Sequence, residues 1–404
     1  MKLKKISALL LCMAMFVTLL GCAGSYEQVD PPAQDDTVQA QVGNDDEDAP
    51  ATGNDDEELD APAPAADLDE LPAAEVARQG FNHYDGAVTY TELVAMLGEI
   101  PPIDGDITIG FTAKAFENEF WRLVADGVEA AEQELQGLGI DVTIDARAAL
   151  GEGDELGQLA VLDDMVNRRY SGIMLSPIAD GNLLPGVENA LREGIPMMVV
   201  NDAFMPQIRN TWGAWHLEGA QLAAQWVYEQ IGGEGQIAIV QGLPVNEAAR
   251  IRTDGFREWI ETNAPNIEIV GIQNADWDRL RAMEVADIWL TQFPDLRAIY
   301  ANNDTMAMGV LEAVREADKL GEVLVIGTDG TGEALDSIAA GELSATVDNY
   351  PFYMGLIGVE IMLRIMGGQD VPLVIYSPQA VIDSTNYDMD TSELIGWTGF
   401  QFAD

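Results

Sequence analysis

Polar side chains able to bind a small ligand stand where two short apolar runs of this sequence end. The run 298–301 is followed by Asn303, and the run 323–326 is followed by Asp329. A helical pattern of apolar residues separates the two runs, so 297–330 predicts a strand, a helix and a second strand. Near-continuous apolar strands linked by a helix indicate a parallel sheet covered on both faces. Ligands of such sheets bind outside the carboxyl ends of the strands, so we expect both side chains to contact one.

The same arrangement recurs along the chain. Nearly every predicted strand end carries an amide, a hydroxyl, a carboxylate or a large ring, and the set is Asn118, Phe120, Trp121, Ser176, Asn201, Asp202, Trp277, Asn303, Asp329 and Asn349. Each Asn or Asp taken alone is explained as a turn residue or a helix cap, so the recurrence is the informative feature. Aromatic faces cover the C–H groups of a sugar or polyol, while amides and carboxylates bond its hydroxyls.

The elements that must position these residues form two lobes. Alternating strands and helices over 106–213 and again after 214 predict an α/β protein with two doubly wound parallel sheets facing each other across a ligand cleft. We expect 106–213 plus 350–376 to form the N-terminal lobe, and 214–349 plus 377–404 to form the C-terminal lobe, joined by crossover hinge strands. Residues 78–105 are expected to be an extension packed on the main body.

The front of the chain has the features of an export signal. Lysines in the first five residues precede an apolar run over 6–20 that is short for a membrane span. Leu19-Leu20-Gly21-Cys22 resembles the bacterial lipoprotein box, so we predict cleavage after residue 21 and a lipid on Cys22. The alternative is an ordinary cleaved signal. Residues 22–77 are rich in Asp, Glu, Ala and Pro, and they are expected to form a disordered acidic tether.

Composition excludes several classes of protein. Asp and Glu number 69 against 20 Lys and Arg, and the net charge of −49 would repel nucleic acid. Cys12 and Cys22 are the only cysteines, so the mature chain has no internal disulfide or cysteine metal cluster. The acidic runs lack the ligand spacing of a calcium loop. We therefore expect no metal and no cofactor.

The sequence has few of the residues and motifs that catalysis uses. Its only histidines are His83 and His216. It has neither a Gly-x-Ser-x-Gly elbow nor a Walker loop, and GEGDELG over 151–157 misses the dinucleotide fingerprint by one position. Asp202 and Asp329 remain a conceivable acid/base pair, because sequence gives no distance between them. We predict that the protein is not an enzyme.

From residue 107 to about 374 the chain resembles the ribose-type periplasmic sugar-binding proteins, the solute receptors of ABC importers. The resemblance is carried by ENEFW, EAARIRTDGF, ADWDR, ANNDTMAMG, IGTDG and ATVDN. It implies ligand contacts for Asn118, Phe120, Trp121, Arg252, Trp277, Asn303, Asp329 and Asn349. The chain departs from the ribose pattern with Ser176 in place of Asn, Asn201-Asp202 in place of Asp-Arg, and Thr328 in place of an aromatic residue. Replacing an arginine, which donates through two nitrogens, by an acceptor changes which ligand hydroxyls the pocket can bind. Another pentose, a hexose, a polyol or a related polar solute is therefore as compatible as ribose.

This resemblance predicts a lipid-anchored receptor on the outer side of the bacterial cell membrane. It would be a monomer that captures a sugar or polyol by hinge closure and delivers it to the transmembrane subunits of an ABC permease. Two alternatives stay open. The same fold can pass ligand occupancy to a chemoreceptor or sensor kinase, and a carbohydrate-acting enzyme is the less favoured one.

Overall fold

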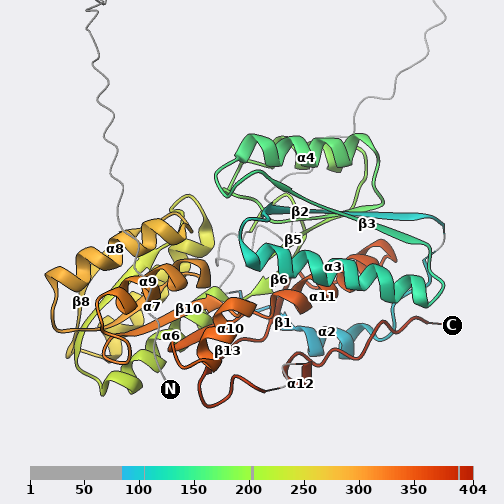
Figure 1. The fold of residues 1–404 in the computed structure, drawn as a ribbon. Coiled ribbons are helices and arrows are strands. Elements are labelled where there is room, and N and C mark those ends of the chain that lie inside the picture. The colour runs from blue at the N-terminus through green and yellow to red at the C-terminus, as the bar shows by residue number, and fades with distance from the viewer. Residues whose placement is uncertain (1–83, 104, 202–203, 390–391, 404) are drawn as a thin grey trace, which may run out of the picture. The chain divides into compact units, whose positions relative to one another are not determined.

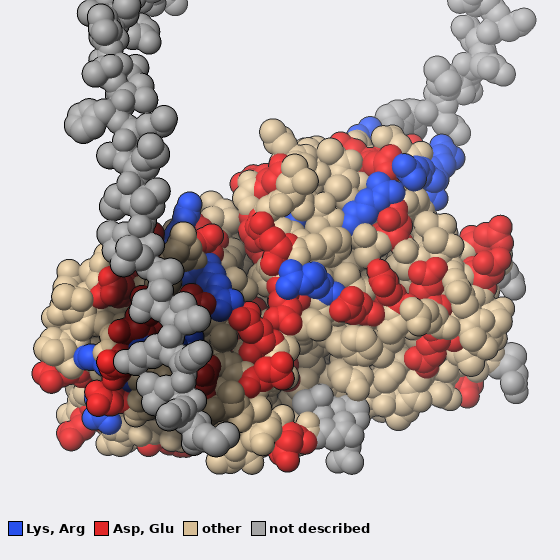
Figure 2. All heavy atoms as spheres, viewed as in Figure 1, with Lys and Arg blue, Asp and Glu red and all other residues tan. Residues whose placement is uncertain are grey.

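The computed structural model describes residues 84–103, 105–201, 204–389 and 392–403, and all of these belong to one compact unit, Pro64–Asp404. The predicted signal, Cys22, the acidic tether and Asp202 lie outside the described residues. Within those residues, no helix has both the length and the apolar character that crossing a membrane requires. Acidic side chains are spread widely over the face seen in Figure 2, among fewer basic ones.

The first lobe is built on a seven-stranded sheet in which every neighbouring pair is parallel (Figure 1). In spatial order its strands are β1 (Val88–Thr89), β12 (Val374–Ser377), β6 (Asn210–Ala214), β5 (Met197–Val200), β4 (Gly172–Leu175), β2 (Ile107–Ala115) and β3 (Val142–Ala149). The central strands β4 and β5 are buried along their whole length, as expected for a sheet covered on both faces.

The second lobe has a six-stranded sheet that is parallel except for one antiparallel edge strand. Its order is β13 (Ala380–Asp383), β11 (Ala345–Asp348), β10 (Leu324–Asp329), β9 (Leu296–Ala301), β7 (Gly235–Gln241) and β8 (Ile267–Asn274). These two sheets confirm the predicted fold class. They also place the carboxyl ends of β9 and β10 next to each other. Asn303, just after β9, and Asp329, the last residue of β10, therefore lie at the same edge of the sheet.

Helices cover both faces of each sheet. The first lobe carries α3 (Glu119–Gly137), α4 (Glu155–Asn167), α5 (Leu184–Arg192) and α11 (Pro351–Met366). The second carries α6 (His216–Ile231), α7 (Glu247–Asn263), α8 (Arg279–Gln292), α9 (Asp304–Glu316) and α10 (Gly332–Ala339). The buried apolar residues form separate clusters on the two faces, with α3 and α11 opposite α4 and α5, and α6 and α7 opposite α8 and α9.

Two glycines let α3 and α11 cross at close range. A Cβ on Gly127 would lie 1.9 Å from the carbonyl oxygen of Phe352, and a Cβ on Gly355 would lie 2.0 Å from that of Val124. Because each glycine faces the backbone of the other helix, no larger residue fits at either position without moving a helix.

Among the described residues the chain passes between the lobes at four places: from β6 to α6, from β11 to α11, from β12 to β13, and from β13 to the C-terminal residues 392–403. Two tryptophans that sequence left undecided lie near the first crossing. Trp212 is fully buried in the core, where its Nε1 donates to the carbonyl of Met354 at 2.9 Å. Trp215 stacks on Tyr376, with ring centroids 4.3 Å apart.

The segment before β2 packs on the first lobe through α2 (Tyr90–Leu97). The Tyr90 hydroxyl donates to Glu360 Oε2 at 2.8 Å, and Glu360 forms a buried ion pair with Arg364 at 2.7 Å. Arg364 Nη1 in turn donates to the carbonyl of Gly98 at 2.8 Å. These contacts attach the extension to α11.

The end of the chain differs from the expectation that 377–404 belongs to the second lobe. Strand β13 does so, but α12 (Ser392–Ile395) and the residues after it return to the first. Ile395 and Phe400 are buried in the same apolar cluster as Tyr90, and backbone hydrogen bonds join Ile100 to Gln401 and Ala403. The tail packs beside α2, where Trp397 lies 6.2 Å from the Tyr90 ring, and beside α3, where Phe400 N donates to Glu134 Oε1 at 3.4 Å.

Candidate functional site

A pocket lies where strand ends of both lobes meet. It is lined by Lys114, Asn118, Phe120, Trp121, Glu152, Asn201, Ala248, Arg252, Trp277, Asn303 and Asp329. The empty space inside this lining, counted together with its opening to solvent, is about 270 Å³, so the pocket can hold only a small ligand such as one sugar ring. Eight of the eleven predicted ligand-binding residues are on this lining.

Aromatic rings reach the pocket from both lobes. Phe120 and Trp121 stand at the start of α3, edge to face with centroids 4.9 Å apart. Trp277 follows β8 in the second lobe and holds a left-handed backbone with φ 65°. Its ring covers Gly242, where a Cβ would lie 2.3 Å from the indole. The rings provide flat apolar surface on both sides of the site.

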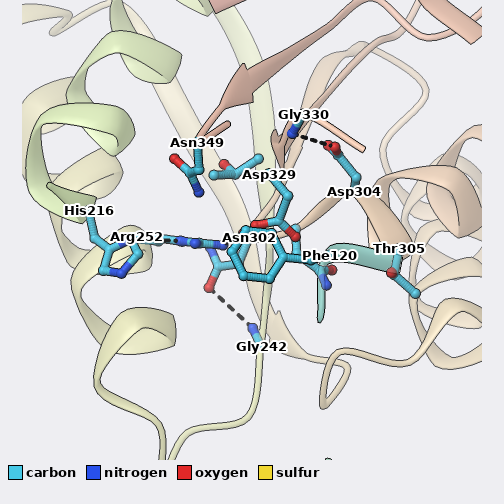
Figure 3. A network of polar contacts seen from close by, with 12 residues as sticks. Phe120, His216, Gly242, Arg252, Asn302, Asp304, Thr305, Asp329, Gly330 and Asn349 are labelled. Atoms are coloured by element: carbon cyan, nitrogen blue, oxygen red, sulfur yellow. Dashed lines mark hydrogen bonds and ion pairs between the residues drawn. The ribbon is translucent and has the colours of Figure 1, made fainter. Parts of the chain in front are cut away.

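Arg252 is held rigidly in the second lobe. Its Nε donates to His216 Nδ1 at 3.3 Å, and its Nη1 donates to the carbonyl of Asn302 at 2.7 Å and to Asp329 Oδ1 at 3.1 Å (Figure 3). Asn302 is itself fixed, because its Oδ1 accepts from Gly242 N at 3.1 Å. Nη2 makes no hydrogen bond with the described residues, so one arm of the guanidinium is left for a ligand.

Asp329 shares this buried environment. Its backbone has φ 139°, an uncommon conformation for a residue with a side chain. Burial raises the pKa of its carboxyl well above the usual value, the charge of Asp304 adds to that effect, and the Arg252 guanidinium opposes it. The pair gives the pocket an acceptor beside a donor, 3.1 Å apart and shielded from water.

Asp304 supports the site from behind. Its Oδ2 accepts from the backbone N of Gly330 at 2.9 Å (Figure 3). The same oxygen accepts from the backbone N of Thr331 at 2.9 Å, and Oδ1 accepts from Thr346 Oγ1 at 2.6 Å. Burial raises its pKa to about 6. The carboxylate thus ties the start of α9 to the turn after β10, fixing Asn303 and Asp329 relative to each other.

Two of the predicted asparagines are helix caps as well as pocket residues. Asn303 Oδ1 accepts from Met306 N at 3.0 Å and caps α9, while its Nδ2 has no partner among the described residues. Asn118 Oδ1 accepts from Phe120 N at 3.1 Å and from Thr305 Oγ1 at 3.4 Å, so this residue caps α3 and also contacts the other lobe. The capping role and the pocket role therefore coexist.

Asn201 is the residue best placed to bind through an oxygen. It is buried at the end of β5 with φ 76°, and its Oδ1 has no partner within the described part of the chain. Gly213 on the neighbouring strand makes room for this backbone, since a Cβ there would lie 2.3 Å from the Asn201 carbonyl oxygen. A buried unpaired acceptor on the pocket wall is costly unless a ligand hydroxyl bonds it.

Three predicted residues are not on the lining. Ser176 is fully buried at the end of β4, where its backbone carbonyl accepts from Gln158 Nε2 at 2.7 Å. Asn349 follows β11, accepts from Gln379 Nε2 at 2.5 Å, and has an Nδ2 without a partner among the described residues. Asp202 lies outside the described residues. Ligand contact by any of the eleven remains a prediction.

Sequence reasoning missed Lys114, Glu152 and Ala248. Lys114 is the next-to-last residue of β2, buried, with its Nζ 5.5 Å from the centre of the Trp121 ring. A lysine inside an otherwise apolar strand was an available signal for a special role. Glu152 comes from a loop, which no periodic pattern could have placed.

A hollow that shares Asn118, Glu152 and Trp277 with the pocket has a mainly acidic rim. Its rim includes Glu117, Glu119, Glu152, Asp276, Asp278 and Glu333, with Arg122 and Arg279 among them. Several of these charges are paired, as in Arg279 with Glu333 at 2.8 Å. An anionic ligand would meet repulsion at this rim, whereas a neutral one would not.

Two lobes of this topology on either side of a polar pocket with aromatic walls are typical of a solute receptor. Residues 109–370 match the family model described as a periplasmic binding protein domain, and the chain belongs to that family. It is a sugar-binding solute receptor family of ABC transporters that acts outside the cytoplasm, and its relatives are transport proteins rather than enzymes.

Individual relatives are similar over most of their length. The D-allose-binding periplasmic protein of Escherichia coli is 35% identical over 273 residues, which cover 64% of this chain and 85% of that protein. The ribose import binding protein of Bacillus subtilis is 28% identical over 274 residues, 68% of this chain and 86% of that one.

Solved structures of solute-binding proteins are also similar to this chain. A solute-binding protein of Bacillus halodurans with bound myo-inositol has a TM-score of 0.65 and 26% identity, covering 71% of this chain and 97% of that one. One of Actinobacillus succinogenes with bound D-allose has the same TM-score and identity, covering 70% and 99%.

Proposed function

We propose that this chain is a lipid-anchored receptor that captures a neutral sugar or polyol between its lobes and delivers it to the permease subunits of an ABC importer. The observation that carries the proposal is the pocket itself. Rings from both lobes, Phe120 and Trp121 facing Trp277, enclose the buried pair Arg252 and Asp329. Relatives that bind allose and ribose support a small carbohydrate.

Hinge closure is the proposed mechanism of capture. In the described form the lobes touch across the cleft through Asn118 with Thr305 at 3.4 Å, Asp180 with Arg250 at 2.8 Å, and the backbone of Glu333 with Glu119 at 3.4 Å. A ligand that contacts both lobes adds interactions available only when they are closed. It therefore shifts the population toward the closed form, which a permease can recognise.

The charges on the lining favour a neutral ligand. Lys114 and Arg252 are balanced by Glu152 and Asp329 among the described lining residues. A neutral ligand keeps the two positive and two negative side chains balanced. A charged ligand would bring a buried charge for which the pocket has no opposite charge to spare. The small size of the pocket and this charge balance support a monosaccharide or a cyclic polyol.

The binding proposal is tested on the mature chain carrying Cys22→Ser, which prevents lipid attachment. Thermal unfolding is followed with D-allose, D-ribose, other pentoses and hexoses, and myo-inositol, and calorimetry follows any hit. A specific ligand at a thousandfold excess over Kd stabilises the folded protein by about 4 kcal/mol. Failure of every carbohydrate to raise the melting temperature would overturn the sugar assignment, and consumption of the ligand would overturn the absence of catalysis.

Closure and assembly need separate measurements. Small-angle scattering with and without the ligand should show a decrease in the radius of gyration, and an unchanged radius would contradict hinge closure. Light scattering coupled to size exclusion should give the mass of one chain, and a larger mass would overturn the proposed monomer. Uptake of labelled ligand should fail in cells that lack this protein and return with the wild type.

The anchor is tested through Cys22. We expect the full-length protein to fractionate with the membrane and to incorporate a labelled fatty acid, and the Cys22→Ala variant to do neither. A variant that stays membrane-bound would show that another segment holds it. This result bears on localisation only, because the sugar site lies far along the chain from residue 22.

A further inference from the structure

His216 lies directly behind the sugar pocket without being part of its lining. It is the first residue of α6, just after the crossing from β6, and its side chain is buried. Its Nδ1 accepts a hydrogen bond from Arg252 Nε at 3.3 Å (Figure 3). The described residues contain no other histidine. His216 is therefore linked to the pocket through one side chain, and that side chain is a pocket residue.

The guanidinium of Arg252 is held at two of its three nitrogens. Nη1 donates to the carbonyl of Asn302 at 2.7 Å and to Asp329 Oδ1 at 3.1 Å, while Nε donates to His216. A planar group bonded at one nitrogen alone can still turn about that nitrogen, whereas bonds at two nitrogens fix the direction of the third. His216 supplies the second of these bonds. The direction of Nη2, the arm left for a ligand, therefore depends on His216.

The same hydrogen bond defines where the imidazole carries its proton. An arginine nitrogen donates and cannot accept, so His216 Nδ1 must accept through its lone pair. The imidazole is then neutral, with its hydrogen on Nε2. A hydrogen on Nδ1 would instead point at the N–H of Arg252, and the bond would be lost. The protonated nitrogen of His216 is therefore an observable consequence of this geometry.

We propose that His216 is a positioning residue for sugar binding, whose unprotonated Nδ1 holds Arg252 so that Nη2 donates to one hydroxyl of the ligand. This inference rests on the proposed function as a sugar receptor. The ligand class is a neutral monosaccharide or cyclic polyol with a hydroxyl oxygen that accepts from Nη2. Ordering a long side chain costs conformational entropy. A guanidinium that is already fixed before the ligand arrives avoids that cost at binding, so the affinity is higher.

Two substitutions of His216 have nearly the same shape and differ in the acceptor. His216→Asn keeps an oxygen close to the place of Nδ1, whereas His216→Leu has no polar atom there. Glu218→Gln is the control on the same helix, because it changes an exposed residue that does not line the pocket. All variants are made in the mature Cys22→Ser chain, and melting temperatures without ligand report whether each one is folded.

Calorimetry then measures Kd for the tightest binder among D-allose, D-ribose and myo-inositol, and for each of its monodeoxy analogues. Arg252→Met removes every donor of the guanidinium. The analogue that this change weakens least identifies the hydroxyl that Arg252 binds. We expect His216→Leu to weaken the parent sugar at least about fivefold and that same analogue by less than about twofold. His216→Asn should stay within about twofold of the wild type for every ligand, and Glu218→Gln should change no Kd.

A role for His216 in folding alone gives a different pattern. His216→Leu would then weaken the parent and all analogues by one common factor, and that result would overturn the positioning role. Equal losses for the Asn and Leu variants, no weakening by His216→Leu, or an Arg252→Met variant that weakens all analogues alike would also overturn it. The receptor would still stand in each of these cases. A wild-type chain that binds none of these sugars would overturn both proposals.

A spectroscopic measurement tests the same contact even where His216→Leu does not fold. The mature chain has two histidines, so His83→Gln leaves His216 as the only one. With ¹⁵N-labelled histidine, long-range ¹H–¹⁵N correlation at neutral pH should show an unprotonated Nδ1 and a protonated Nε2. A proton on Nδ1 would contradict the hydrogen bond from Arg252 and overturn the inference.

Discussion

The buried carboxyl of Asp304 makes the stability of the protein depend on pH in a predictable direction. Its pKa is about 6 in the folded protein against an ordinary value of 3.8. Because the folded state holds this proton more tightly than the unfolded chain, its contribution is fully present below pH 4 and is lost as pH rises through 6. The total loss is about 3 kcal/mol, and about 1.4 kcal/mol of it develops between pH 5 and pH 8.

The Asp304→Asn variant should lack this loss. An amide can keep the carbonyl oxygen toward Gly330 and Thr331 and turn its NH₂ toward Thr346, whose hydroxyl then accepts. Any fixed cost of the new hydrogen bonds is independent of pH. The difference in unfolding free energy, variant minus wild type, should therefore increase by at least 1.4 kcal/mol, to about 2 kcal/mol, from pH 5 to pH 8. The charge of Asp304 also raises the pKa of Asp348, which adds to the change in the same direction.

Urea unfolding followed by tryptophan fluorescence, at several pH values over this range, measures the difference. Asp287→Asn is the control, since Asp287 is an exposed aspartate on α8 and its replacement should leave the curve parallel to that of the wild type. Parallel curves for Asp304→Asn would refute the reasoning, because they would show that Asp304 is not buried as an ionisable group whose charge is costly.

Three further changes have expected outcomes. Trp277→Ala should weaken sugar binding at least tenfold by calorimetry, whereas Trp259→Ala, outside the pocket, should leave Kd unchanged; equal effects would contradict the stacking role. Asp329→Asn should weaken binding about 10- to 100-fold through loss of a charged acceptor, and an unchanged Kd would remove Asp329 from the site. Gly355→Ala should lower the unfolding free energy by about 3 kcal/mol, because its Cβ would lie 2.0 Å from a backbone oxygen of α3. Gly358→Ala is the control. The nearest atom to its Cβ would be 3.4 Å away, so this change should be neutral or stabilising by up to about 1 kcal/mol. Urea unfolding measures the free energy of each glycine variant, and similar losses for both would refute the close crossing of α3 and α11.

The predictable part of the fold came from local patterns. Runs such as 298–301 and 323–326 indicate buried parallel strands on composition alone, and the edge at which parallel strands end follows from the topology. Asn303 and Asp329 could be brought together this way because Asn303 comes just after β9 and Asp329 ends β10, and these strands are neighbours in one sheet. The same reasoning placed most of the pocket lining.

The parts of the fold and the site that could not be predicted depend on contacts between segments that are distant in the sequence. Glu152 reaches the pocket through a turn that Asp154 closes, and no spacing in the sequence reveals that turn. The return of Ile395 and Phe400 to the first lobe depends on α2, some 300 residues earlier in the chain. Trp212 lies within β6 and fills the core, whereas Trp277 comes after β8 and lines the pocket. The residue type does not distinguish these two roles, because they depend on how distant segments pack.

The packing of α2 against the C-terminal tail has a practical consequence for anyone building a fluorescent biosensor from this protein. Tyr84 packs beside β12 and Ala403 is hydrogen-bonded to Ile100, so the first and last described residues belong to the same lobe. Fluorophores fused at both ends would travel together during hinge closure, and energy transfer between them would report little. One fluorophore inserted in an exposed turn of the other lobe, such as the one around Gly321, would move relative to either end and register the ligand.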